Sequence, residues 1–272
     1  MRTSKSKLIG KILICVFSMF LASNQAISQN NFENREQTLK NGRQLSYCIF
    51  GDTEGEPVFY FHGFPGTYSD VPIFNGDEVA KQLNIKIIAI NRPGYGTSTT
   101  QDTRTLLDWP DDIAEFADSL KINKFSILGY SGGGPFALSC AYKISERINK
   151  VVVVSGMGPF NAPEAKRGKS MTIVKAPEMM SKGMKKIIDE KPEKFEAKMI
   201  KSMPKIDQKV LSDSIVRNNF ILTIKEAFKY GYSGTKQDAI IYKNSWGFGL
   251  QVIALHISLN NNNLLKTLKS FY

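Results

Sequence analysis

A serine set between closely spaced glycines is the strongest chemical signal in this sequence. In KFSILGYSGGGPFAL, the residues Gly129, Ser131 and Gly133 form the pattern G-x-S-x-G between an apolar, strand-like run and a helix-like run. A strand that turns sharply into a helix exposes a serine hydroxyl, and glycines are needed two residues on either side because a Cβ there would clash. The N-terminus of the following helix adds positive potential near the hydroxyl. The pattern therefore predicts Ser131 as a nucleophile.

A second glycine-rich turn directly follows the strand-like run PVFYF. It reads His62-Gly63-Phe64-Pro65-Gly66. Such a turn can aim the backbone N–H of Phe64 at an oxyanion, with the N–H of Gly132 as the second donor. Loss of one donor of this kind costs about 3–4 kcal/mol of transition-state stabilisation. We expect His62 to fix the turn by hydrogen bonding and not to transfer protons.

Other cofactor and metal chemistries find no support in the sequence. A third glycine-rich segment, NRPGYGTS at residues 91–98, marks a sharp turn that we interpret as structural. Neither a P-loop nor a G-x-G-x-x-G pattern occurs, which excludes the usual phosphate and dinucleotide sites. Three cysteines and two histidines cannot build the usual Cys/His zinc sites. No metal and no cofactor are therefore expected.

The elements that must position these residues alternate, from Asn41 onward, between short apolar runs and helical stretches. Strand-like runs occur at 43–51, 57–63, 86–90, 124–129 and 150–156. Residues 79–85 have the pattern of the end of a helix. Apolar residues recur at helical spacing in 111–120 and 135–147. Apolar strands that alternate with helices predict an α/β fold, a mostly parallel sheet with helices on both faces.

Residues 159–240 break this rhythm. They contain no convincing buried strand and are predicted to form several helices rich in Met and Lys. Acidic residues are interleaved with the lysines, aromatic residues are sparse and no nucleic-acid-binding motif occurs, which excludes a nucleic-acid partner. We interpret the segment as a helical insertion with a solvated, charged face.

The first 28 residues have the features of a secretory signal peptide. Positive residues come first (Arg2, Lys5, Lys7 and Lys11). An apolar run from Ile12 to Ala22 and small residues at Ala26 and Ser28 follow. The run is shorter than the roughly 20 residues that span a bilayer, although a retained membrane anchor is the alternative. We expect export to the periplasm or medium, with no stable membrane anchor after cleavage.

Signal cleavage changes the charge and the cysteine count. Removal of the four positive residues lowers the net charge from +11 to about +7. Only Cys48 and Cys140 remain. An exported compartment permits a disulfide, but one cysteine lies in a strand-like run and the other in a helix-like run. Two separate buried thiols are the favoured interpretation.

In this order and spacing, the three glycine-rich motifs resemble the α/β-hydrolase fold family. The resemblance covers Asn41–Gly156 and continues past a helical cap to NSWGFGL, Asn244–Leu250. It implies a serine hydrolase acting on a small, apolar, ester-like substrate by carboxylester or related acyl or C–C bond hydrolysis. A serine at the elbow argues against the dehalogenase and epoxide-hydrolase branches, which have an aspartate there.

The resemblance also implies the site residues and a division of the chain. Ser131 is the nucleophile, Phe64 and Gly132 are the oxyanion donors, and the cap shapes substrate choice. The expected division is a signal peptide at 1–28, an N-terminal hydrolase core at 29–157, a cap at 158–243, and a return to the core with an aberrant tail at 244–272.

The sequence departs from the family after the cap. The family's triad runs Ser, then Asp or Glu, then His, but no acidic residue follows Asp238. The only late histidine is His256, which falls where an incoming strand is expected, so the triad acid and base are unassigned and His256 is the remaining candidate. The tail is interpreted as truncated or out of frame, which leaves the C-terminal core incomplete. The alternative is that the tail forms a genuine short helix. The sequence thus predicts little or no turnover, and a silent exported binding protein is the competing hypothesis.

Overall fold

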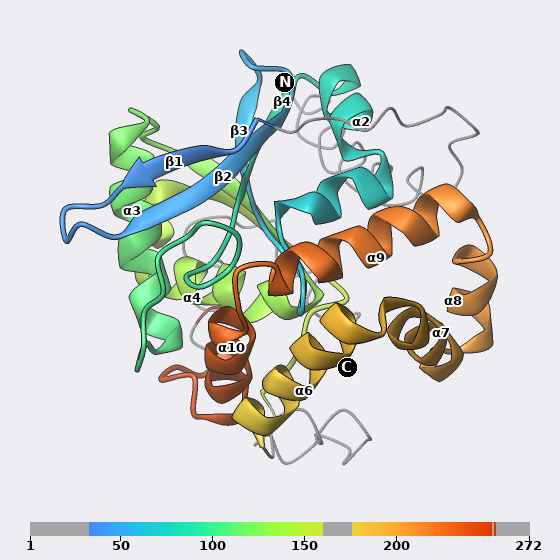
Figure 1. Cartoon of the computed structure of the whole chain (residues 1–272). Helices are drawn as coiled ribbons and strands as arrows, with labels where there is room; N and C mark the ends of the chain where they lie inside the picture. Colours follow the sequence, from blue (N-terminus) through green and yellow to red (C-terminus); the bar gives the residue numbers. More distant parts are fainter. Residues whose placement is uncertain (1–32, 160–175, 252, 254–272) are drawn as a thin grey trace.

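A six-stranded sheet forms the centre of the molecule (Figure 1). The computed structural model describes residues 33–159, 176–251 and 253. Within them the strand order is β1-β2-β4-β3-β5-β6. The strands are β1 (Arg35–Thr38), β2 (Gln44–Gly51), β3 (Glu56–Phe61), β4 (Ile85–Ile90), β5 (Phe125–Tyr130) and β6 (Ile148–Val154).

The sheet is parallel except at the β1 edge. The pairings β4–β3, β3–β5 and β5–β6 are parallel, whereas β1–β2 and β2–β4 are antiparallel. This confirms the predicted α/β class and mostly parallel sheet. Strand β1 was not predicted, because its four residues are mostly exposed and have no apolar alternation.

Helices cover both faces of the sheet. They pack through two separate buried clusters: α3 and α4 share one with Phe59 and Ile88, and α2 shares the other with Tyr60 and Ala89. Residues one position apart along a strand point to opposite faces, so strands apolar on both sides need this double cover. The helices of the core are α2 (Gly76–Gln82), α3 (Trp109–Ser119) and α4 (Gly134–Lys143), with short 3₁₀ segments η1 (Tyr68–Phe74), η2 (Leu106–Asp108), η3 (Ser131–Gly133) and η4 (Ser145–Arg147).

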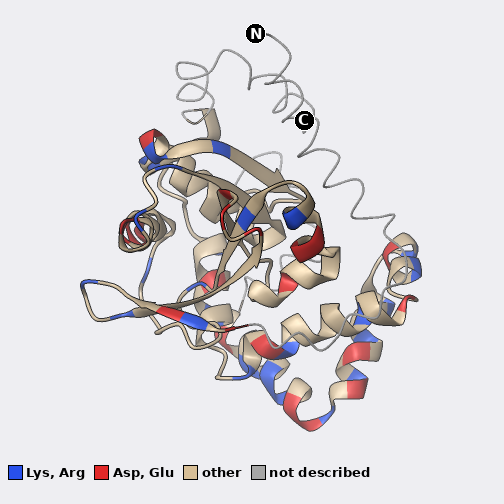
Figure 2. Ribbon diagram, turned by 90° about the horizontal axis from the view of Figure 1, so that it is seen from above, with Lys and Arg blue, Asp and Glu red and all other residues tan. Residues whose placement is uncertain are grey.

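The segment predicted to be a helical insertion is helical wherever the structure describes it. Its helices are α6 (Pro177–Glu190), α7 (Pro192–Ser202), α8 (Lys205–Val210), α9 (Ser214–Phe228) and α10 (Ser233–Lys243). Figure 2 shows basic and acidic residues interleaved along these helices. Among the described residues, no helix combines the length and the hydropathy needed to cross a bilayer.

The last helix of the insertion packs into the core. Ile241 and Tyr242 of α10 belong to the same buried cluster as the residues of α3 and α4, and Trp246 joins them. The chain was expected to return to the core near 244–250, and Trp246 in this segment packs into the core cluster. The four predicted segment boundaries stay predictions.

Two local predictions differ from the structure. The helix expected at 135–147 ends at Lys143, because Ile144 adopts φ −128°, outside the helical range, and its side chain is buried in the core; a 3₁₀ turn follows. The strand expected at the start of LQVIALHISL is wrong: Leu250, Gln251 and Ile253 are helical. The rest of that run, including His256, lies outside the described residues.

The two cysteines within the described residues are separate thiols. Cys48 on β2 and Cys140 on α4 are both free and buried. They belong to different clusters on opposite faces of the sheet. The preference for two buried thiols over a disulfide is confirmed.

Candidate active site

Ser131 occupies a strained turn between β5 and α4. Its φ is +48°, in the left-handed region that non-glycine residues rarely adopt. A Cβ on Gly129 would lie 2.8 Å from the Cβ of Ala137, and a Cβ on Gly133 would lie 2.1 Å from the carbonyl oxygen of Phe61. These contacts are shorter than atoms tolerate, so both positions require glycine. The local sequence thus folds as the nucleophile elbow that its G-x-S-x-G pattern predicts.

The structure brings the two expected oxyanion residues together. A Cβ built on Gly132 would lie 3.1 Å from the Phe64 nitrogen and 2.5 Å from its Cβ. Among the described residues, the Phe64 N–H has no hydrogen-bond acceptor. The hydroxyl of Tyr242, from α10, donates to the carbonyl oxygen of Gly132 at 2.8 Å and fixes that peptide. The turn after β3 and the elbow after β5 therefore meet where an acyl oxygen would be bound.

His62 is held in the oxyanion turn by both ring nitrogens. Its Nδ1 lies 2.9 Å from the carbonyl oxygen of Gly63, to which it donates, and its Nε2 accepts from the backbone N–H of Arg92 at 3.2 Å. The ring is fully buried. Burial, together with the positive charge of Arg92, lowers the pKa of His62 well below its usual value. A neutral imidazole with both nitrogens engaged cannot take a proton from Ser131.

A buried ionic cluster braces the same turn. Asp238, on α10, accepts hydrogen bonds from Arg92 at 2.9 Å, from Arg104 at 2.5 Å and from the hydroxyl of Tyr95 at 2.9 Å. Arg92 in turn donates to the carbonyl oxygens of His62 at 2.6 Å and of Gly63. Sequence reasoning missed the cluster, because Arg92 and Asp238 are 146 residues apart and no spacing links them.

Asp70 is a second buried carboxylate beside the turn. Its Oδ2 accepts the backbone N–H of Gly63 at 2.7 Å, and its side chain has almost no solvent exposure. Burial raises the pKa of Asp70 to about 6, although the hydrogen bonds from Gly63 and Thr223 oppose the shift. Nothing in the spacing of the sequence distinguishes this aspartate from those on the surface.

The raised pKa of Asp70 makes the stability of the protein depend on pH. The carboxyl has a pKa of about 3.9 when unfolded, so its stabilising contribution is complete below that pH and is lost as the pH rises through about 6. Relative to Asp70→Asn, which does not titrate, the wild type should lose about 2 kcal/mol of unfolding free energy between pH 4.5 and 7.5. Urea unfolding of both proteins at the two pH values measures this, with Asp189→Asn on exposed α6 as the control. An equal pH response of wild type and Asp70→Asn would contradict the assignment.

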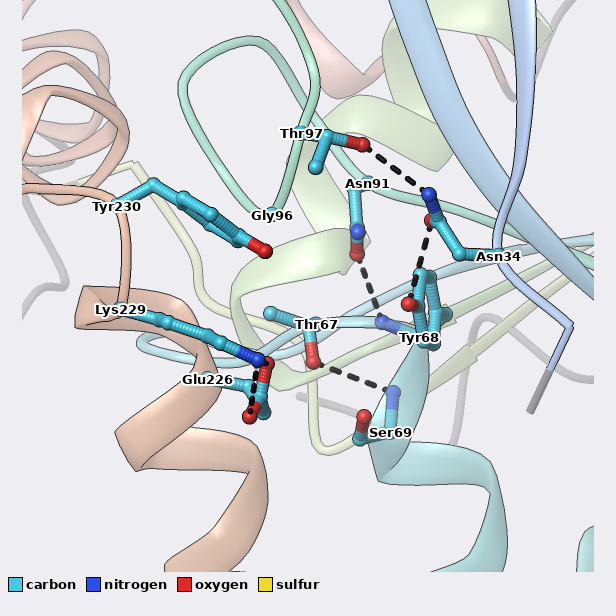
Figure 3. A pocket seen from close by; sticks show the side chains of 10 residues that line it. All are labelled: Asn34, Thr67, Tyr68, Ser69, Asn91, Gly96, Thr97, Glu226, Lys229 and Tyr230. Carbon is cyan, nitrogen blue, oxygen red and sulfur yellow. Dashed lines mark hydrogen bonds and ion pairs between the residues drawn. The ribbon is translucent and has the colours of Figure 1, made fainter. Parts of the chain in front are cut away.

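A polar cleft of about 160 Å³ lies beside Thr67, the residue that follows the turn (Figure 3). Thr67 and Asn91 come from the core, and Lys229 and Tyr230 from the end of α9. Several of its side chains bond to one another: Asn34 donates to the hydroxyl of Thr97 and accepts from the hydroxyl of Tyr68, each at 3.3 Å. Neither Ser131 nor Phe64 lines it, so the cleft is separate from the nucleophile.

The triad acid and base remain unassigned among the described residues. His62 is the one histidine there, and its nitrogens are already bonded. His256 lies outside the described residues. Within the same ranges, no three His, Cys, Asp or Glu side chains cluster as metal ligands would.

Comparison with known proteins agrees with the geometry of this site. A profile described as the alpha/beta hydrolase fold matches residues 56–175, which include both the oxyanion turn and the elbow. Over these residues the chain matches the α/β-hydrolase fold family. The resemblance of the chain to this family, which the three glycine-rich motifs indicated, is therefore confirmed.

Two curated proteins have sequences similar to part of this chain. The chain is 28% identical over 130 residues to the non-heme chloroperoxidase of Streptomyces lividans, covering 45% of this chain and 44% of that protein. It is 26% identical over 130 residues to the bifunctional esterase/perhydrolase of Acinetobacter calcoaceticus, covering 45% of each. The chain thus spans less than half the length of these relatives.

Solved structures extend the likeness to the fold. The esterase of Exiguobacterium antarcticum superposes with a TM-score of 0.55 at 18% identity, over 77% of this chain and 73% of that chain. A hydrolase of Pseudomonas aeruginosa gives 0.57 at 16% identity, over 80% and 75%. At such identities the likeness concerns the hydrolase fold alone.

Proposed function

We propose that this chain binds small carboxylic esters and accepts their acyl group on Ser131. The observation that carries the proposal is the meeting of the Ser131 elbow with the Phe64 N–H beside Gly132, an N–H that no acceptor among the described residues engages. The esterase among the related proteins supports an ester-like substrate.

The chemistry follows from the groups at the site. The Oγ of Ser131 forms a bond to the ester carbonyl carbon, and its proton passes to water or to a base. The carbonyl oxygen gains the negative charge, which the N–H groups of Phe64 and Gly132 stabilise. Collapse of this intermediate breaks the bond to the alcohol, which leaves and takes up a proton, and an acyl ester of Ser131 remains.

Proton transfer limits this reaction in the proposed mechanism. His62 is neutral and engaged, so His256 is the remaining histidine in the sequence. A serine hydroxyl without an activating base is a weak nucleophile at neutral pH. Oxyanion and binding effects by themselves accelerate hydrolysis by about 10³–10⁴-fold over water. We therefore propose that turnover by this chain is slow.

Steady-state hydrolysis of p-nitrophenyl butyrate tests the slow turnover. We expect a rate enhancement over buffer that does not exceed about 10⁴-fold. His256→Gln should leave the rate unchanged if no histidine acts as the base. Fast turnover that Ser131→Ala abolishes would contradict the proposal of an impaired site, and loss of that turnover in His256→Gln would identify the base.

We also propose that the protein is exported. The support is the run of positive, apolar and small residues in positions 1–28. Expression in a bacterium followed by osmotic shock should release a chain that starts near Gln29. Recovery of the full-length chain in the membrane fraction would favour the anchor instead.

A further inference from the structure

Asp70 lies against the oxyanion turn, although no step of the proposed reaction uses it. It belongs to η1, the segment that directly follows the turn. The backbone N–H of Gly63 and the hydroxyl of Tyr60 both donate to its Oδ2, at 2.7 and 3.3 Å. Each of these hydrogen bonds is stronger when the carboxylate of Asp70 is negatively charged.

The turn is shaped around this carboxylate. A Cβ on Gly66 would lie 2.8 Å from Oδ1 of Asp70, and a Cβ on Gly63 would lie 3.4 Å from Oδ2. Gly66 in particular leaves the space that the carboxylate fills. Gly66 therefore serves the close approach of Asp70 as well as the tight turn itself.

A hydroxyl from the insertion completes the arrangement. Thr223 of α9 donates to Oδ1 of Asp70 at 2.8 Å and accepts the backbone N–H of Thr67 at 3.1 Å. Thr223, Thr67 and Asp70 are all buried. Figure 1 shows α9 running alongside the core at this point, and α9 and η1 are in extensive contact.

These bonds hold the turn at both ends of the residue that presents the oxyanion donor. Gly63 precedes Phe64 and is bonded to Asp70, whereas Thr67 follows it and is bonded to Thr223. The Thr223–Asp70 bond joins the two anchors to each other and to α9. A shift of α9 would therefore move the Phe64 N–H relative to Gly132.

We infer that Asp70 and Thr223 are positioning residues, which set the Phe64 N–H for oxyanion binding and couple it to helix α9 of the insertion. The inference rests on the proposed function of the Ser131 site. It implies that the packing of α9 affects the acylation rate more than the binding of the ester.

Substitutions at Thr223 test the inference. Thr223→Val removes the hydroxyl at similar volume and should lower the rate of Ser131 acylation by p-nitrophenyl butyrate about tenfold, with an unchanged half-saturating concentration, because a bond to a charged group is lost. Thr223→Ser keeps the hydroxyl and should restore the rate. The matched control is Thr235→Val, which removes a buried hydroxyl that bonds only within the insertion, to the carbonyl of Tyr232. Equal rates in Thr223→Val and Thr235→Val would overturn the inference.

Amide hydrogen exchange provides a readout that does not depend on acylation. Thr223→Val should speed exchange in residues 62–69 at least about tenfold, whereas Thr235→Val should not. If Thr223→Val fails to fold, the wild type decides: the Gly63 amide should exchange at least about tenfold more slowly than that of Phe64, and equal rates would contradict the role of Asp70. Protection of Gly63 without acylation of Ser131 would show that the proposed function fails while the turn is held as inferred.

Discussion

Replacement of Gly132 with alanine should slow acylation of Ser131 by about 10²–10³-fold, the loss typical of one oxyanion donor. The added Cβ would lie 2.5 Å from the Cβ of Phe64 and 2.7 Å from the hydroxyl of Tyr242. The Cβ of Phe64 moves only with its backbone, whose nitrogen would lie 3.1 Å from the added atom, so this backbone must shift, and overpacking of this kind costs about 1–3 kcal/mol. The relaxation moves Phe64, and with it the donor that faces the acyl oxygen.

The matched control for this substitution is Gly183→Ala. Gly183 lies in α6, and a Cβ there would meet no atom within 4 Å. Alanine is favoured over glycine inside a helix by about 1 kcal/mol, so the control should keep the acylation rate and gain stability. Acylation rates measured by mass spectrometry decide the comparison. Equal rates in Gly132→Ala and the wild type would show that Phe64 and Gly132 do not bind the oxyanion.

Asp238→Asn should be the most destabilising single change of charge in the described part of the chain. The carboxylate is fully buried between the guanidinium groups of Arg92 and Arg104, themselves almost fully buried. Loss of its charge removes the carboxylate that both buried cations contact, and breaking a buried pair in this way costs about 3–5 kcal/mol. The variant should also weaken the hydrogen bonds that Arg92 donates to the carbonyl oxygens of His62 and Gly63.

Urea unfolding measures this effect against an exposed ion pair. Asp189→Asn removes the partner of Lys185 on the surface of α6, where half of the Asp189 side chain is exposed. Such pairs contribute about 0–1 kcal/mol. A loss below about 1 kcal/mol in Asp238→Asn would mean that the cluster does not hold α10 to the core.

The sequence predicts the local parts of this molecule well. The strands β3, β4 and β5 are apolar runs, and the G-x-S-x-G pattern around Ser131 contains the glycines that its own backbone clashes require. These features are encoded within about ten neighbouring residues. The order of the motifs along the chain then leads to the family, which the profile match confirms.

The supports of the site could not be predicted in the same way. Asp238 meets Arg92, and Thr223 meets Asp70, across about 150 residues, and none of these four residues belongs to a pattern of fixed spacing. The antiparallel strand β1 and the helical start at Leu250 also depend on tertiary packing, which outweighs local preference. The described contacts add what the motif leaves open: α9 bonds to Thr67 and Asp70 next to the oxyanion turn, and α10 bonds to the elbow.

The most direct test of the proposed site is peptide mass spectrometry after incubation with p-nitrophenyl butyrate. The p-nitrophenolate of this ester leaves readily, whereas an acyl-serine is a poorer electrophile whose hydrolysis needs a base. We therefore predict that one butyryl group accumulates on the peptide that contains Ser131, and that Ser131→Ala shows none there while surface lysines react equally in both proteins. A protein that only binds esters would show no acyl group on Ser131, and that result would contradict the proposal.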